Sequence, residues 1–208
     1  MTADPAFLAV ACSLGMTPVV LLLAERTTHR RRRPGLGETA AAASLVGFLI
    51  TTAAAGRSAA EAAALASVLA IALAAATVDT LEGRLPDDLT AGLAVGATLA
   101  VLGHSAVVGD IGPVLRASVA AGALLAGCLV LKIAADDAIG WGDVKFAPTL
   151  AAIVAAWRPE GLLVGAIVAV LLVGMTAVGV AAVERTRRTH VPYGPALLAG
   201  AVAGLAVV

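Results

Sequence analysis

Charged and aromatic residues are both scarce in this sequence of 208 residues. Charged side chains make up 13% and aromatic side chains 3% of the chain, whereas 60% of its residues are hydrophobic. Soluble domains carry about a quarter charged residues, so this composition excludes an ordinary water-soluble fold. The formal net charge is zero, and the positions of the charges are therefore more informative than their sum.

Cysteine and metal-binding patterns are also nearly absent. The two cysteines, Cys12 and Cys128, lie inside apolar runs without CxxC or metal-ligand spacing, and we interpret both as small packing residues. The sequence contains no HExxH motif, which excludes a zinc protease of that type. We expect neither a metal nor a cofactor. The first apolar run lacks a basic start and a cleavage site, which favours a retained helix over a signal peptide.

Long hydrophobic runs fill most of the chain. The mean hydropathy is +0.98, and apolar runs of about 15–23 residues alternate with short polar breaks, as in a polytopic α-helical membrane protein. We predict an all-α fold with about eight transmembrane helices and both termini outside. The predicted spans are residues 6–24, 39–55, 61–78, 89–108, 113–135, 144–157, 161–182 and 192–208. Small-residue pairs at helical spacing predict close helix crossings. These pairs are Gly92/Gly96, Gly161/Gly165 and Gly200/Gly204.

The distribution of Lys and Arg predicts the orientation. One side of the predicted bundle carries Arg26, Arg30, Arg31, Arg32, Arg33, Arg84, Lys132, Lys145, Arg185, Arg187 and Arg188. The other side carries Arg57, Arg116 and Arg158. The side with more cations is expected to be cytoplasmic. We interpret the basic run at 29–33 as a topology signal that contacts anionic lipid, and not as a nucleic-acid site.

Two acidic stretches lie at boundaries between predicted spans. The stretch Gly140-Trp141-Gly142-Asp143-Val144-Lys145 lies at the start of the sixth span, and Asp79 lies at the end of the third. Ionisable residues at the edge of a bilayer are costly and tend to be functional, and glycines without side chains permit close approach. In the predicted orientation both carboxylates face the cytoplasm. We therefore predict that Asp79 and Asp143 form one site.

The predicted sixth span is short for a membrane helix. Its 14 residues give roughly 21 Å of helix at ~1.5 Å per residue, less than the ~30 Å of hydrocarbon. Two arrangements remain open at this point: the bilayer thins around the span, or the segment 140–143 dips into the membrane.

Paired aspartates suit peptide hydrolysis for an electrostatic reason. Two carboxylates in one site do not both ionise easily, so one keeps a proton while the other is charged. The charged carboxylate takes a proton from water, and the neutral one donates a proton to the scissile carbonyl. Such a pair titrates as a unit, so the sequence assigns neither aspartate permanently as acid or base.

Simpler roles compete for each polar residue. A single Asp at the end of a membrane helix is often only a solvated end residue. Asp87 and Asp88 follow Pro86 and are predicted to be N-cap residues of the fourth span. Lys145 is either an interfacial cation or a site residue, and the sequence leaves both roles open.

The motifs resemble those of the type IV prepilin peptidase family of membrane aspartyl proteases. That family has an Asp followed seven residues later by the Pro of a hydrophobic-Pro-Asp/Asn turn, and a Gly-x-Gly-Asp-x-Lys motif. The first motif is matched by Asp79 with Leu85-Pro86-Asp87, and the second by Gly140–Lys145. A weaker match, to a Pro-aromatic-Gly-Pro entry into the last helix, is Val191-Pro192-Tyr193-Gly194-Pro195. The resemblance covers about residues 39–208.

The resemblance implies a function and a set of site residues. Asp79 and Asp143 would be the catalytic pair of an aspartyl endopeptidase. The expected supporting residues are Gly140, Gly142, Lys145, Pro86 and Asp87. The implied substrate is a prepilin or pseudopilin precursor, cleaved between its basic leader and its hydrophobic helix at the cytoplasmic face of a bacterial plasma (inner) membrane. The bilayer is the other expected partner, and no nucleic acid is expected.

The interval between the first two spans departs from many members of that family. These members carry a cytoplasmic domain there, with CxxC pairs, linked to N-methylation of the new N-terminus. Here the interval is Glu25 to Glu38, 14 residues without cysteine, which is too short for such a domain. We predict a first helix and short basic loop (1–38), a membrane-embedded peptidase domain (39–208), and no methyltransferase activity.

Other classes of protein compete with this interpretation. Presenilin-like and signal-peptide-peptidase-like proteases share Gly-x-Gly-Asp and a Pro-Ala-Leu motif, present here at 195–197, but Val78 stands where they place a Tyr. A small transporter or other non-enzymatic membrane protein would use the acids to bind ions or protons. A serine protease is excluded because His104 and Ser105 are adjacent, are expected in an outer loop and lack a nucleophile elbow.

Overall fold

The computed structural model describes residues 57–134, 139–184 and 193–207. Within these ranges the fold consists of six helices and contains no strand. The helices are α3 (Ala59–Glu82), α4 (Asp87–Val108), α5 (Gly112–Ala134), α6 (Trp141–Trp157), α7 (Gly161–Glu184) and α8 (Gly194–Ala206). They correspond to the third to eighth predicted spans, so the all-α prediction is confirmed. The predicted spans 6–24 and 39–55 lie outside the described residues, and the total of eight spans and the location of the termini remain predictions.

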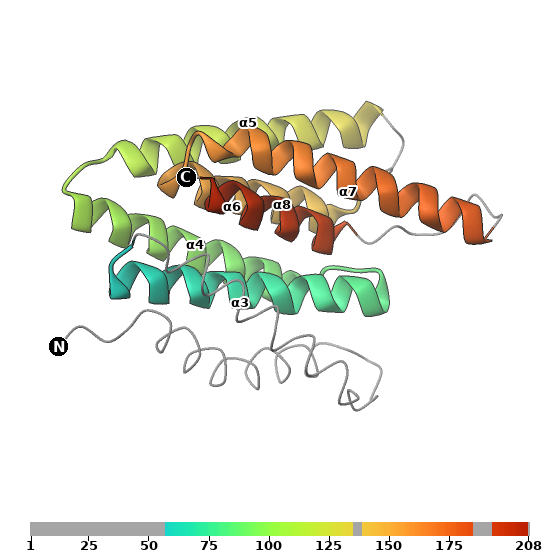
Figure 1. The fold of residues 1–208 in the computed structure, drawn as a ribbon, viewed down its shortest axis with the longest axis horizontal. Helices are drawn as coiled ribbons and strands as arrows, with labels where there is room; N and C mark the ends of the chain where they lie inside the picture. The colour runs from blue at the N-terminus through green and yellow to red at the C-terminus, as the bar shows by residue number, and fades with distance from the viewer. Residues whose placement is uncertain (1–56, 135–138, 185–192, 208) are drawn as a thin grey trace.

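The helices pack as three layers of two (Figure 1). The first layer pairs α3 with α4, and the middle layer pairs α8 with α6. The third layer contains α7, which packs on α8, and α5, which packs on α6. The middle helices contact both outer layers: α6 contacts α4, α5, α7 and α8, while α8 contacts α3, α6 and α7. The helices that begin with the Gly-x-Gly-Asp and Tyr-Gly-Pro residues therefore form the centre of the bundle.

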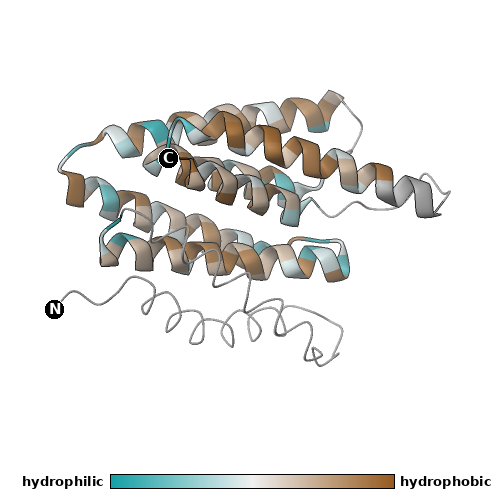
Figure 2. Cartoon of the chain, in the orientation of Figure 1, coloured by the Kyte–Doolittle hydropathy of each residue, from teal (hydrophilic) through white to brown (hydrophobic). Residues whose placement is uncertain are grey.

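The lengths and surfaces of the helices suit a bilayer. Four helical segments are long and apolar enough to cross a membrane: Ala59–Glu82, Asp87–Val108, Gly112–Ala134 and Gly161–Val178. Hydrophobic residues cover the helix shafts, and hydrophilic ones gather toward helix ends and turns (Figure 2). Val119, Leu163 and Val170 on the outer layers are each 70% exposed. Such apolar surface would be a liability in water and is the ordinary condition in lipid.

The core lies where α3 meets the middle layer and α4. Leu69 of α3, Leu93 of α4 and Phe146 of α6 are each 0% exposed, and all three belong to one continuous cluster that also includes Leu198 and Leu205 of α8. Burial of a large apolar side chain stabilises the fold by roughly 1.5–3 kcal/mol in water. Inside a bilayer, close packing contributes much of the same stabilisation.

Local signals define the ends of α3 and α4. Ser58 and Glu61 form a capping box at the start of α3, and Gly83 ends it in the left-handed conformation at φ 65°. Pro86 is the N-cap of α4, so the prediction that Asp87 and Asp88 are N-cap residues is wrong. Both are first-turn residues, where a carboxylate interacts favourably with the helix dipole.

Helix α6 begins three residues earlier than predicted. Gly140 is its N-cap and Trp141 its first residue, because nothing in Trp-Gly prevents a helical first turn. Its 17 residues span roughly 26 Å at ~1.5 Å per residue, still less than the ~30 Å of hydrocarbon. Residues 141–143 are therefore the first turn of α6 and not an irregular segment before it, and both arrangements of this short helix in the bilayer stay predictions.

The glycine pairs of α7 and α8 pack against each other. A Cβ built on Gly165 would lie 2.8 Å from the carbonyl oxygen of Gly200, and one on Gly204 would lie 2.8 Å from that of Gly161. Backbones approach this closely only where side chains are absent. The α4 pair differs, because a Cβ on Gly92 would meet nothing within 4 Å among the described residues. The packing interpretation is thus confirmed for α7 and α8 and stays a prediction for Gly92, since two predicted spans lie outside those residues.

Candidate active site

Asp79 lies in the last turn of α3 and is 1% exposed. Its backbone carbonyl accepts a hydrogen bond from Gly83 (2.8 Å), which closes the helix. Its side-chain Oδ2 accepts a hydrogen bond from the backbone N–H of Gly194 at 2.8 Å. The carboxylate is therefore held inward, against the start of α8.

Asp143 lies in the first turn of α6 and is 5% exposed. Its Oδ2 is close to the N-cap, since a Cβ on Gly140 would lie 3.1 Å from it. The next residue, Val144, belongs to a small buried cluster with Ala147 and Cys128 of α5. Cys128 is thus a buried packing residue, as predicted, whereas Cys12 lies outside the described residues.

Direct contacts join the two predicted motifs. A Cβ on Gly142 would lie only 2.5 Å from Cβ of Leu85 and 3.4 Å from its Cα, so the first turn of α6 rests on the turn between α3 and α4. Beside this contact, Lys145 Nζ donates a hydrogen bond to Asp87 Oδ1 at 2.6 Å. The side chains of this ion pair are 51% and 80% exposed, so its net contribution to stability is small.

The first turn of α8 completes this end of the bundle. Gly194 begins the helix and reaches Asp79, as described above. Leu197, one turn further on, packs against both the main core and the cluster that contains Val144 and Ala147. The three predicted motifs therefore converge at one end of the bundle, around two buried carboxylates.

An apolar cavity of about 400 Å³ opens between α3 and α8. It is lined by Leu73, Ala76, Thr77, Thr80, Pro195, Leu198, Ala199, Val202, Ala203 and Ala206. The hydroxyl groups of Thr77 and Thr80 donate to carbonyls of their own helix, at 2.8 and 2.9 Å. Thr80 and Pro195 of the lining directly follow Asp79 and Gly194 in the sequence, so the cavity begins near Asp79. Because its lining is apolar, the cavity suits an apolar segment whose backbone polar groups are already hydrogen-bonded to one another.

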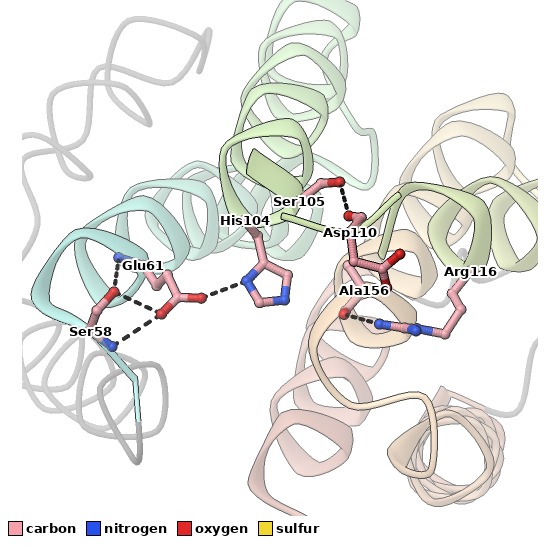
Figure 3. A network of polar contacts seen from close by, with 7 residues as sticks. All are labelled: Ser58, Glu61, His104, Ser105, Asp110, Arg116 and Ala156. Carbon is pink, nitrogen blue, oxygen red and sulfur yellow. Dashed lines mark hydrogen bonds and ion pairs between the residues drawn. The ribbon is translucent and has the colours of Figure 1, made fainter. Parts of the chain in front are cut away.

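A second polar cluster lies at the opposite end of the bundle (Figure 3). Glu61, 18 residues before Asp79 in α3, is roughly 27 Å away at ~1.5 Å per residue. His104 Nδ1 lies 2.5 Å from Glu61 Oε1, and its ring stacks on Trp157 with centroids 4.5 Å apart. His104 and Ser105 are in the last turns of α4, so their predicted placement in a loop is wrong. Glu61, His104 and Trp157 tie α3, α4 and α6 together.

Cations complete this second cluster. Arg116 Nη2 donates to the carbonyl of Ala156 at 3.3 Å, which satisfies a carbonyl in the last turn of α6. Burial lowers the pKa of the Arg57 guanidinium, and the charge of Arg158 lowers it further. Among the residues that the structure describes, no three His, Cys, Asp or Glu side chains gather as a metal site.

Sequence reasoning identified most of the residues around Asp79 and Asp143 and missed others. Gly142, Lys145, Pro86 and Asp87 all lie at the contact between the motifs. Gly194 was noted only as part of a weak motif, and Leu197 only as part of the Pro-Ala-Leu motif of an alternative family. Their positions depend on where α8 packs, which no local pattern encodes.

Two buried carboxylates at one end of an apolar bundle have a limited set of uses. They can bind a cation, relay protons, or act together as general acid and base on a substrate that reaches them. Geometry alone leaves these uses open.

The sequence profile described as the type IV leader peptidase family matches residues 66–183. The matched segment includes both buried aspartates and both motifs that meet at the α3–α4 turn. No curated protein and no solved structure matches the chain. Because the profile covers more than half of the 208 residues and the apolar helices are long enough to span a bilayer, the chain belongs to the type IV leader peptidase family and is an integral membrane peptidase.

Proposed function

We propose that the protein is an aspartyl endopeptidase that removes the basic leader of prepilin-like or pseudopilin-like precursors. The observation that carries this proposal is the contact between the two motifs, Gly142 against Leu85 and Lys145 on Asp87. This contact holds the start of α6 against the end of α3, where Asp143 and Asp79 are both buried.

Burial supplies the chemical reason for a shared proton. Ionising both carboxylates in an apolar, low-dielectric interior is costly, so the pair holds one proton. The ionised carboxylate takes a proton from water as the water oxygen bonds to the scissile carbonyl carbon. The protonated carboxyl gives its proton to the carbonyl oxygen, which forms a neutral tetrahedral intermediate. The C–N bond then breaks as the carboxyl that took the proton from water gives it to the leaving nitrogen. A hydroxyl proton of the intermediate passes to the other carboxylate, which restores the shared proton as the carboxylic acid product forms.

The arrangement also suits a substrate with a polar leader and an apolar helix. The carboxylates lie at one end of the bundle, beside the hydrophilic turn between α3 and α4, while the helix shafts beyond them are hydrophobic. A leader outside the bilayer and a helix within it would place the peptide bond between them near that end. The excess of Lys and Arg that the sequence predicts on this side supports a location of this end at the cytoplasmic face of a bacterial plasma membrane.

The alternatives are less well supported. A transporter would need the acids for ion or proton binding, whereas the family match is to peptidases. A presenilin-like protease also uses Gly-x-Gly-Asp, but Val78 occupies the position of its Tyr. The short interval 25–38 leaves no room for a methyltransferase-associated domain, so we propose peptidase activity alone.

Cleavage of a prepilin precursor in membranes tests the proposal. We expect the wild type to release the leader, and Asp79→Asn or Asp143→Asn to lose at least about 1,000-fold in rate, because neither variant retains a complete acid–base pair. Asp88→Asn is the matched control, since Asp88 is an exposed acid near the same end and should remain active. Normal cleavage by either dyad variant at equal expression would show that the proposed pair is not catalytic.

A further inference from the structure

The first turn of α8 lies between the helices that carry the two aspartates. On one side, the Gly194 N–H donates to Asp79 Oδ2 at 2.8 Å. On the other, Leu197 packs into the cluster with Val144 and Ala147, which flank the first turn of α6. One helical turn thus touches both halves of the candidate site.

A backbone N–H group at the start of α8 donates to Asp79. Gly194 is the first residue of the helix, and the N–H groups of a first turn have no acceptor within their own helix. The following Pro195 has no N–H at all. A hydrogen bond from a helix N-terminus to a carboxylate is charge-assisted and is further favoured by the helix dipole. The bond therefore fixes the orientation of Asp79.

Gly194 also leaves no room for a side chain. A Cβ there would lie 3.0 Å from Asp79 Oδ2, 3.2 Å from the Cα of Ala76 and 3.3 Å from Asp79 Cβ. Two of these neighbours belong to Asp79 and the third to the backbone of α3. Any larger residue must therefore move the carboxylate or separate α8 from α3.

The rest of α8 is held rigidly by its neighbours. A Cβ on Gly200 would lie 2.5 Å from the Gly165 carbonyl oxygen. A Cβ on Gly204 would lie 3.0 Å from Cγ1 of Val154 in α6. Close backbone packing of this kind allows little sliding. This packing holds the first turn of α8 in position against Asp79.

We propose that the first turn of α8 is a positioning element of the active site, in which Gly194 orients Asp79 and Leu197 sets the position of the α6 turn that carries Asp143. Gly194 and Leu197 act through the aspartates and are positioning residues, not catalytic ones. The inference rests on the proposed peptidase function, because only a two-carboxylate reaction requires this alignment.

Steady-state kinetics of Gly194→Ala tests the role of Gly194. The full-length protein, in phospholipid vesicles, cleaves a purified precursor that has a short basic leader ahead of an apolar helix. We expect kcat to fall about 100-fold while KM changes less than about threefold, because misplacing a reacting group by ~1 Å costs a factor of this size. Gly92→Ala is the control, since its Cβ would meet nothing within 4 Å, and it should keep the wild-type kcat.

Substitutions of Leu197 separate positioning from folding. We expect Leu197→Ala to lower kcat about tenfold and Leu197→Met to restore most of it, because Met fills a similar volume. Leu162→Ala is the matched control, since Leu162 is also a partly buried Leu packed on the main core but lies at the start of α7. Thermal unfolding in detergent, measured for every variant, allows kcat to be compared among folded proteins only.

The possible outcomes distinguish this inference from the proposed function. If the wild type cleaves no precursor, the proposed function fails, whatever the variants do. If the wild type cleaves and Gly194→Ala retains kcat within about threefold, the positioning role is wrong. It is also wrong if rates fall only in proportion to the loss of folded protein, with Leu197→Met no better than Leu197→Ala.

Discussion

At the scale of single residues, the contact of Gly142 with Leu85 is the feature that most constrains the site. Sequence reasoning selected Gly142 because it lacks a side chain, but could not name the residue that comes close to it. The structure supplies this partner: a Cβ on Gly142 would lie 2.5 Å from Leu85 Cβ. The glycine is needed for space and not for unusual backbone angles, because the positive-φ glycines among the described residues are Gly83 and Gly109.

Substitution of Gly142 by Ala should therefore push the first turn of α6 away from the α3–α4 turn. We expect the overpacking to cost about 1–3 kcal/mol of stability, and cleavage to fall at least about tenfold because Asp143 moves with the turn. The measurements are precursor cleavage in vesicles and thermal unfolding in detergent. Gly103→Ala is the control, because a Cβ at Gly103 would meet nothing within 4 Å.

The double variant Leu85→Ala/Gly142→Ala identifies the cause of this loss. Removing most of the Leu85 side chain relieves part of the contact, so the double variant should be more active than Gly142→Ala alone. A coupling of this sign is expected only for residues in direct contact. Strictly additive effects would mean that the space between Gly142 and Leu85 does not determine the position of Asp143.

The residues that sequence could and could not predict differ in a physical way. Asp79 and Asp143 are recognisable because an acid at the end of an apolar run is costly and therefore rare. Gly194 and Leu197 act through tertiary contacts with Asp79 and with Val144. Gly194 is 115 residues from Asp79 in the sequence, and Leu197 and Val144 also come from different helices. Contacts between such distant segments leave no trace in local composition, so neither role could be derived before α8 was placed.

At the scale of helices, hydropathy located the elements well and their ends less well. The shafts of α3 to α8 follow from length and apolar composition. The start of α6 was predicted three residues late, because Trp141-Gly142-Asp143 is not hydrophobic although it is helical. His104 and Ser105 were expected in a loop for the same reason. Hydropathy reports membrane-embedded length, whereas hydrogen bonds and caps determine where a helix ends.

Two glycines of α7, Gly165 in contact with α8 and Gly174 without a close neighbour among the described residues, allow a matched test of helix packing. Replacing a mid-helix Gly by Ala improves intrinsic helix stability by about 0.8–1 kcal/mol. A Cβ on Gly165 would lie 2.8 Å from the backbone oxygen of Gly200, whereas one on Gly174 would meet nothing within 4 Å. We expect Gly165→Ala to lower the unfolding temperature and Gly174→Ala to raise it slightly. Equal effects of the two substitutions in detergent would contradict the proposed close packing of α7 on α8.

At the scale of the whole molecule, polar residues are concentrated at two opposite ends of an apolar bundle. One end holds Asp79 and Asp143 with the motif contacts around them. The other holds Glu61 and His104, with the His104 ring stacked on Trp157. The two clusters share the long helices α3, α4 and α6, so each helix is fixed at both ends. This division predicts that stability and catalysis respond to different substitutions.

Substitution of His104 by Ala tests this division of the molecule. It removes the contact with Glu61 and the stacking on Trp157, and we expect it to cost about 1–3 kcal/mol because a partly buried carboxylate loses one of its hydrogen-bond partners. His104→Phe keeps a ring above Trp157 and should lose less. Because this cluster lies roughly 27 Å from Asp79 along α3, kcat of the folded protein should stay within about twofold of wild type. A loss of kcat in both variants, measured well below their unfolding temperatures, would mean that the cluster of Glu61, His104 and Trp157 also sets the geometry of the two carboxylates.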